Sequence, residues 1–215
     1  VVGVLYGALI ALVQSDLRRL LAFASISHVG LAMLGLSSLN APGLQGAVFL
    51  IVNLGLVSTG MLLAAGFIHQ RVGSSDLAAL GGLAQRAPAL TAFALIAAFG
   101  ALALPGTSGF PGEFLILLGA FRANFWLGTI AVTTVILAAA YVLVYFERAF
   151  HGRIRSTTVD AVSDLRPREG LTAGVVGVMI VVLGFFPSVI LDYTSGSVDD
   201  LVSRLDPSTT AASKD

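Results

Sequence analysis

The chain has 215 residues, of which 56% are hydrophobic and 11% are charged, and its formal net charge is zero. Soluble domains carry about 25% charged residues, so this composition is typical of an integral membrane protein and gives no indication of a nucleic-acid partner. The chain has no cysteine, which excludes disulfides, iron–sulfur clusters and thiolate metal sites from it. Any electron carrier must therefore lie in another chain.

The apolar residues fall into six windows that predict transmembrane helices, because a bilayer core of about 30 Å requires about 20 apolar residues. In chain order the windows cover residues 1–13, 20–36, 46–68, 88–121 with an interruption, 126–146 and 171–191. The opening lacks a Met and a basic leader, which indicates a fragment that begins inside a transmembrane helix. The expected fold is an all-α polytopic transmembrane helix bundle of about six spans over residues 1–191, the fourth a broken helix, followed by a polar C-terminal tail over residues 192–215.

Positive charge is distributed unevenly between the loops. If the chain alternates sides at each window, nine arginines share one face, and Arg122, Arg204 and Lys214 lie on the other. Cytoplasmic loops carry an excess of Lys and Arg, so we expect the arginine-rich face in the cytoplasm and both chain ends on the non-cytoplasmic side. The nine residues of the first face are Arg18, Arg19, Arg71, Arg86, Arg148, Arg153, Arg155, Arg166 and Arg168.

Glu113 is the charged residue predicted to lie deepest in the membrane. It precedes the end of the fourth window by eight residues, or about 12 Å of helix at 1.5 Å per residue. A charge near the bilayer centre costs at least about 3 kcal/mol, so such a residue is a candidate for a functional site facing a cavity or a partner. The alternative is a glutamate that only snorkels toward the membrane surface or caps a kink in the helix.

The run PGTSGFPGEF before and around Glu113 predicts a helix break at membrane depth. Proline donates no backbone hydrogen bond and glycine permits irregular dihedral angles. Irregular backbone inside a membrane is tolerated where it is buried in protein or lines water, and transport proteins use it to build ion sites. A helix N-terminus at the break would favour the carboxylate of Glu113, whereas burial would disfavour its charged form. The residues expected to form the break are Pro105, Gly106, Thr107, Ser108, Gly109, Pro111 and Gly112.

Two further polar residues lie inside predicted spans. His28 is a candidate proton relay because imidazole exchanges protons near neutral pH, although a lone histidine in a membrane is as often a hydrogen-bonding group between helices. Asn53 can hold water or a hydrogen bond but cannot carry a proton. Tyr141, Tyr145 and Trp126 are expected to be interfacial or packing aromatics. The hydroxyl residues that could extend a hydrated line are Ser25, Ser27, Ser58 and Thr59.

Four runs resemble the antiporter-like subunits of respiratory complex I, and in particular the subunit M group of bacterial NADH-quinone oxidoreductases. The runs are QSDLRRLLAFASISHVGLAMLGL, GLQGAVFLIVNLGLVSTGMLL, DLAALGGLAQRAP and LALPGTSGFPGEFLILLGAF. The resemblance extends over about residues 1–186 and implies the C-terminal portion of such a subunit. It places the glutamate of the GEF motif, Glu113, and the histidine of the SH motif, His28, in a proton pathway. The family usually has a second histidine where this chain has Asn53, and a neutral amide interrupts a histidine relay unless water bridges it.

The resemblance implies a proton-translocating membrane subunit of an NADH:quinone oxidoreductase, without a complete active site of its own. It implies flavin, iron–sulfur clusters and quinone in partner subunits and no cofactor in this chain. The implied partners are other membrane subunits, including sister antiporter-like subunits, in the lipid bilayer of a bacterial inner membrane. The alternatives are a subunit of a multisubunit cation/proton antiporter or membrane-bound hydrogenase, and a purely structural membrane subunit.

Overall fold

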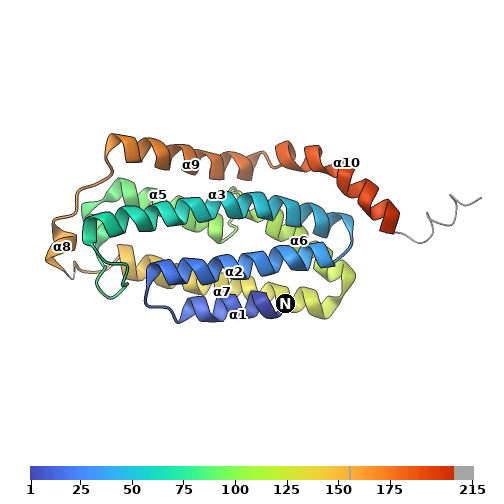
Figure 1. Ribbon diagram of the computed structural model, residues 1–215, viewed down its shortest axis with the longest axis horizontal. Helices are drawn as coiled ribbons and strands as arrows, with labels where there is room; N and C mark the ends of the chain where they lie inside the picture. Colours follow the sequence, from blue (N-terminus) through green and yellow to red (C-terminus); the bar gives the residue numbers. More distant parts are fainter. Residues whose placement is uncertain (155, 206–215) are drawn as a thin grey trace, which may run out of the picture.

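The computed structural model describes residues 1–154 and 156–205, and this part of the chain forms ten helices and no β-strand (Figure 1). The prediction of an all-α membrane bundle is therefore confirmed. The helices are α1 (Val2–Leu12), α2 (Leu17–Ser37), α3 (Ala41–Val72), α4 (Leu83–Arg86), α5 (Pro88–Ala101), α6 (Gly109–Ala123), α7 (Phe125–Phe150), α8 (Thr157–Asp160), α9 (Pro167–Phe185) and α10 (Ser188–Leu205).

The long helices match the predicted spans. By length and composition α2, α3, α7 and α9 are each able to cross a membrane, and α1 and α5 are shorter apolar helices. α5 is followed, after an irregular segment, by α6. The fourth predicted span is therefore a broken helix, as its prolines and glycines indicated.

Polar caps determine where α2 and α3 begin. Asp16 accepts a hydrogen bond from the backbone N–H of Arg19 (3.0 Å), and Asn40 accepts one from Gly43 (3.0 Å). These side chains satisfy N–H groups that have no acceptor within the helix. α3 ends at Val72 and is followed by the capping residue Gly73, whose φ of 76° lies in the left-handed region that glycine adopts without strain. Local sequence therefore sets the ends of the two helices that carry His28 and Asn53.

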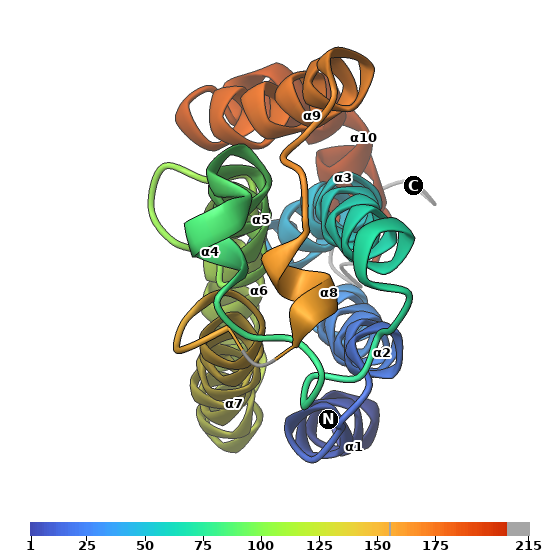
Figure 2. The same cartoon turned by 90° about the vertical axis from the view of Figure 1, so that its left-hand side faces the viewer.

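The helices form two facing rows. Figure 2, which looks along the bundle, shows α1, α2 and α3 in one row and α5, α6 and α7 in the other, with α9 packed across one edge of both. The arginine-rich loops lie together at the left-hand end in Figure 1, where α1, α3 and α7 end and α2, α5 and α9 begin. The predicted alternation of the loops thus agrees with the fold, except that Arg155 and Lys214 lie outside the described residues.

The last predicted span, 171–191, differs from the structure at both ends. α9 begins earlier, at Pro167, and ends at Phe185, and α10 then begins at Ser188. Pro187 separates them because it lacks the N–H that a continuous helix requires. α10 extends beyond residue 191, where the span was predicted to end, and continues to Leu205. The first part of the segment predicted as a polar tail is therefore helical. The remaining part, 206–215, lies outside the described residues.

Arg71, near the C-terminal end of α3, ties the segment before α9 to the bundle. Its guanidinium donates to the carbonyl oxygen of Asp164 (3.1 Å) and pairs with the carboxylate of Glu169. The side chain of Asp164 in turn accepts backbone hydrogen bonds from Ala89 (2.8 Å) and Leu90 (3.0 Å) in the first turn of α5. These contacts hold α3, α5 and α9 together at the arginine-rich end.

Candidate functional site

The helix break places an irregular segment between α5 and α6, which is exposed at Leu104 and Pro105 and buried at Thr107 and Ser108. α5 ends at Ala101 and α6 begins at Gly109. Between them Ala103 and Gly106 have φ values of 49° and 89°, which are incompatible with a continuing right-handed helix. The prediction of a break is correct in its location along the chain.

Hydrogen bonds from Thr107 and Ser108 satisfy backbone groups near the break. The Thr107 hydroxyl donates to the carbonyl oxygens of Phe99 (3.2 Å) and Leu104 (2.7 Å). The backbone N–H of Ser108 donates to the carbonyl oxygen of Ile180 on α9 (2.9 Å). Irregular backbone in a membrane needs such internal partners, so α9 is one of the elements that stabilise the break.

The break is shorter than the run of residues expected to form it. The first four of those residues lie in the irregular segment, but Gly109, Pro111 and Gly112 form the first turn of α6. Pro111 fits there because the first four N–H groups of a helix have no acceptor within it. Glu113 is therefore the fifth residue of α6, beyond the first turn in which the helix dipole acts. The expected stabilisation of its carboxylate by that dipole is wrong for this reason.

Close packing of α6 against α3 brings Glu113 toward the centre of the bundle. A Cβ atom added at Gly46 would lie 2.7 Å from the backbone nitrogen of Ile116, and one added at Gly112 would lie 3.0 Å from that of Leu50. Only glycine allows the two backbones to approach so closely. These two positions fix the depth at which Glu113 enters the interior.

His28 on α2 and Glu113 on α6 form a buried pair. Nε2 of His28 lies 3.4 Å from Oε1 of Glu113, and the residues are 9% and 6% exposed. Direct proton transfer requires about 2.6–3.2 Å between heavy atoms, so a small approach of the two groups, or one bridging water, completes the path. The two candidates that the sequence analysis identified separately thus lie together.

The contacts of the His28 ring determine where its protons are held. Nδ1 lies 2.8 Å from the carbonyl oxygen of Ala24, and Nε2 lies 3.3 Å from that of Ala101. Because a carbonyl oxygen only accepts, the short contact places a hydrogen on Nδ1. Nε2 is then the nitrogen that gains or loses a proton. When protonated it donates to Ala101 and faces the Glu113 carboxylate, and when unprotonated it can accept from the protonated carboxyl.

Asn53 on α3 is buried, and its amide oxygen accepts a hydrogen bond from the Ser108 hydroxyl at 2.5 Å. Ser108 itself is fully buried in the break. The amide therefore links α3 to the irregular segment. Among the described residues, no hydrogen bond joins Asn53 to His28, so the structure places Asn53 beside the pair but outside it.

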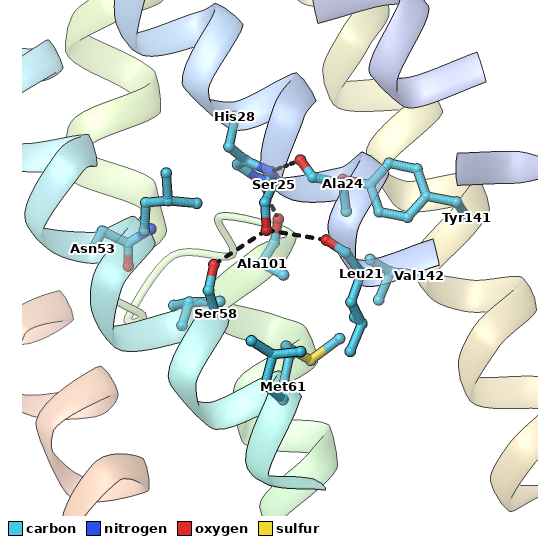
Figure 3. A pocket seen from close by; sticks show the side chains of 13 residues that line it. Leu21, Ala24, Ser25, His28, Asn53, Ser58, Met61, Ala101, Tyr141 and Val142 are labelled. Carbon is cyan, nitrogen blue, oxygen red and sulfur yellow. Dashed lines mark hydrogen bonds between the residues drawn. The ribbon is translucent and has the colours of Figure 1, made fainter. Parts of the chain in front are cut away.

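A small cavity lies between α2, α3, the end of α5 and α7 (Figure 3). We call it the serine cavity. The volume that the centre of a water molecule can occupy in it is about 30 Å³. A water molecule requires about 10–15 Å³ by this measure and two to four polar partners, so the serine cavity has room for water. The hydroxyl oxygens of Ser25 and Ser58, which both line the cavity, lie 3.4 Å apart. Its polar lining consists of Ser25, His28, Asn53, Ser58 and Tyr141.

A second, smaller cavity of about 10 Å³, the glutamate cavity, lies beside the pair. By the same measure it is at the lower limit of the space that one water molecule needs. Glu113 and His28 both contribute to its wall. Its polar lining consists of Ser27, His28, Glu113, Thr134 and Tyr141.

The four predicted hydroxyl residues do not form one line. Ser25 and Ser58 lie on the serine cavity, whereas Ser27 lies on the glutamate cavity and donates to the carbonyl oxygen of Val4 (2.8 Å). Thr59 is exposed, and its hydroxyl donates back to the carbonyl oxygen of its own helix four residues earlier. Only part of the predicted line therefore faces the interior.

Tyr141 is the residue of the site that the sequence did not indicate. The sequence predicted a packing or interfacial aromatic, and the side chain is 1% exposed and extends from α7 toward His28 (Figure 3). Its position well inside the fifth apolar window was the available signal, because interfacial tyrosines lie at the ends of a span.

Comparison with known proteins identifies a family of membrane proteins that this chain matches. The family described as "NADH:quinone oxidoreductase/Mrp antiporter, TM" matches residues 1–138. The chain is 36% identical to NADH-quinone oxidoreductase subunit M of Rhodobacter capsulatus over 203 residues, which is 94% of this chain and 40% of that protein. It thus spans about 40% of the length of the curated relatives that it matches.

Two solved structures have a similar fold. A chain of respiratory complex I from Thermus thermophilus with bound NADH superimposes with a TM-score of 0.84 at 36% identity, covering 94% of this chain and 43% of that one. A chain of the Mrp complex from Dietzia sp. superimposes with the same TM-score at 22% identity, covering 97% of this chain and 46% of that one. The second likeness concerns the fold alone.

Proposed function

Because the chain belongs to the NADH:quinone oxidoreductase/Mrp antiporter membrane family, we propose that it is part of a proton-translocating membrane subunit of an NADH:quinone oxidoreductase. In this proposal the subunit carries no redox chemistry. It couples electron transfer in other subunits to the movement of protons, and His28 and Glu113 lie on the proton path.

The observation that carries the proposal is the buried pair of His28 and Glu113 at the helix break, 3.4 Å apart. The pair has two neutral arrangements: a neutral imidazole with a protonated carboxyl, and an imidazolium with a carboxylate. Either group charged alone would be costly at this depth, so the pair shares one proton when its surroundings are neutral. A negative charge nearby favours uptake of a second proton by the pair, and a positive charge favours loss of the first. A site that couples proton movement to charges elsewhere in the complex needs this property.

Asn53 has a supporting part in this proposal. An amide does not exchange protons at neutral pH, so the step that a histidine would perform at this position falls to water in the serine cavity. The hydrogen bond from Ser108 to Asn53 holds the break against α3, and that contact keeps the cavity open beside His28.

The similarity of sequence favours this function over the alternative of a cation/proton antiporter. NADH-quinone oxidoreductase subunit M of Rhodobacter capsulatus, subunit 13 of Thermus thermophilus and a chain of complex I from Thermus thermophilus are 36%, 40% and 36% identical to this chain. The likeness to the Mrp complex is at 22% identity, and it concerns the arrangement of helices that both groups share.

The proposal assigns the redox groups and the remaining proton path to partner subunits. Flavin, iron–sulfur clusters and quinone are expected there, since this chain has no cysteine to hold a cluster. The partners are other membrane subunits of the complex, including sister antiporter-like subunits. By the excess of arginine at one end of the bundle, that end faces the cytoplasm and both ends of this chain face the other side of a bacterial inner membrane.

The test is the substitution Glu113→Gln in the full-length subunit, assembled in its complex. Glutamine keeps the size and hydrogen-bonding capacity of glutamate but exchanges no proton, so we expect complete assembly with proton pumping per NADH strongly reduced in sealed vesicles. The matched control is Glu147→Gln, because Glu147 is exposed at the end of α7 and its variant should pump normally. Normal pumping in Glu113→Gln would refute the proposal.

A further inference from the structure

The serine cavity and the glutamate cavity share two lining residues, His28 and Tyr141. These side chains therefore form the wall between the two cavities. A proton that moves from Glu113 to the serine cavity through this part of the chain has to pass one of them.

The ring of His28 does not provide that passage as it is held. Its Nε2 faces Glu113 and Ala101, but the opposite nitrogen, Nδ1, is 2.8 Å from the carbonyl oxygen of Ala24. A backbone carbonyl accepts a hydrogen bond but does not pass a proton on. A proton taken up at Nε2 and released from Nδ1 would thus reach no acceptor in the serine cavity unless the ring rotated and broke its shortest hydrogen bond.

Tyr141 has the group that His28 lacks. Its hydroxyl is buried, and no hydrogen-bond partner for it is found among the residues that the structure describes. Buried polar groups are nearly always satisfied by protein or by ordered water, and one left unsatisfied costs about 1–3 kcal/mol. Since this side chain lines two cavities that each contain other polar side chains, among them Ser25 and Ser58 in one and Glu113 in the other, water is the partner that fits.

We propose that the hydroxyl of Tyr141 binds ordered water in the serine and glutamate cavities and relays protons between them, around the ring of His28. This inference rests on the proposed function, because it extends the proton path from the His28–Glu113 pair. It assigns water as the ligand of the Tyr141 hydroxyl and makes that hydroxyl a proton-transferring group of the path.

The relay step conserves atoms and charge. Water on the glutamate side receives a proton from the protonated Glu113 carboxyl as it gives one to the phenolic oxygen. The phenolic proton passes to water on the serine side, and that water passes its excess proton on to the next water. One O–H bond forms and one breaks at the same oxygen, and tyrosine is neutral before and after. Ser25 and Ser58, 3.4 Å apart, provide the next hydroxyl groups for the water that receives the proton.

The test compares Tyr141→Phe with Tyr145→Phe in the full-length subunit of the assembled complex. Tyr145 is a matched control because it is on the same helix, is fully buried and also has a hydroxyl without a partner among the described residues. It lines neither cavity and packs against Phe146 and Phe150. Each substitution removes one oxygen and keeps the ring, so a purely structural effect should be similar for the two.

We expect Tyr141→Phe to reduce the rate of proton pumping by about tenfold or more, since positioned proton-transfer groups contribute about 10²- to 10⁴-fold. The kinetic solvent isotope effect on pumping should also change, because proton transfer would then limit the rate. Tyr145→Phe should leave both quantities unchanged. Equal behaviour of the two variants, or a wild-type rate and isotope effect in Tyr141→Phe, would overturn the relay.

A structure of the assembled complex that resolves buried water tests the water site without reference to activity. We expect water within hydrogen-bond distance of the Tyr141 hydroxyl in the wild type and its loss in Tyr141→Phe. If other buried waters are visible but none contacts Tyr141, the inference fails even if Tyr141→Phe does not assemble. Wild-type pumping in Glu113→Gln would instead refute the proposed function. The structure would still show whether water binds the Tyr141 hydroxyl.

Discussion

The carbonyl oxygen of Ala101 faces Nε2 of His28 at 3.3 Å because the residue four positions after Ala101 is Pro105. In a continuous helix that carbonyl would accept a hydrogen bond from the backbone N–H of residue 105. Proline has no backbone N–H to donate. The helix therefore ends and leaves an acceptor at membrane depth, where the ring of His28 occupies it. The break supplies one partner of Nε2 through this carbonyl and, through α6, which follows it, the second partner of the same nitrogen, Glu113.

The first prediction concerns the interdependence of His28 and Glu113. If the two groups share a proton, removal of either abolishes the function of both, so their effects should not add. We expect His28→Gln and Glu113→Gln each to lower pumping by about tenfold or more, and the double variant to pump no worse than the poorer single variant. The measurement is the initial rate of acidification of vesicles at fixed NADH turnover.

Additive losses in this cycle would indicate two separate proton sites and contradict the pair. A control for the loss of an imidazole is His69→Gln. His69 lies near the C-terminal end of α3, and its Nδ1 is 3.3 Å from the hydroxyl of Ser75. That contact is outside both cavities, so the His69 variant should pump at the wild-type rate.

The second prediction is that Asn53→His is tolerated. An unprotonated imidazole nitrogen can accept the hydrogen bond that Ser108 gives to the amide, and the serine cavity beside it provides space for the larger ring. We expect normal assembly and at least wild-type pumping. Asn53→Leu should behave differently, because it leaves the fully buried hydroxyl of Ser108 without its acceptor at a cost of about 1–3 kcal/mol.

Assembly of the two Asn53 variants can be compared by native gel electrophoresis of the solubilised complex, followed by pumping measurements. Loss of assembly in Asn53→His but not in Asn53→Leu would mean that the hydrogen bond to Ser108 does not govern this position, because leucine is about as large as histidine and cannot accept that bond.

Charge and helix-breaking residues made the main elements of the site predictable from the sequence. Glu113 and His28 were identifiable because a titratable side chain within an apolar window is costly. Their contact was not predictable, since the residues are 85 positions apart and meet through the packing of α6 against α2 and α3. The start of α6 was misplaced because proline was taken as a sign of irregular backbone, although the first turn of a helix accepts it.

Tyr141 and Thr59 show the same limit at the level of side chains. An aromatic residue in an apolar span is consistent with packing, and the unsatisfied hydroxyl of Tyr141 is visible only in three dimensions. Thr59 follows Ser58 directly, so the two cannot lie on the same face of a helix. That geometry alone would have removed Thr59 from the predicted hydrated line.

The last prediction concerns Asp164 and the pH dependence of the arginine-rich end. Partial burial raises the pKa of this carboxyl, but hydrogen bonds from the backbone N–H groups of Ala89, Leu165 and Leu90 and the nearby Arg71 outweigh that effect, so its pKa lies below the usual value. A group whose pKa is lowered by folding stabilises the folded state above its unfolded pKa of about 3.9. That contribution is lost as the pH falls through the lowered folded value.

We therefore expect Asp164→Ala to speed hydrogen exchange of the amides of Ala89 and Leu90 by about 2- to 30-fold at pH 7, equivalent to the loss of about 0.5–2 kcal/mol for a helix cap. Wild-type protein below the lowered pKa should lose the same protection, after correction for the pH dependence of exchange itself. Asp160→Ala is the control, because Asp160 pairs with Arg86 at the surface and such pairs contribute little. Equal exchange at Ala89 and Leu90 in the two variants would show that α5 does not depend on the Asp164 carboxylate.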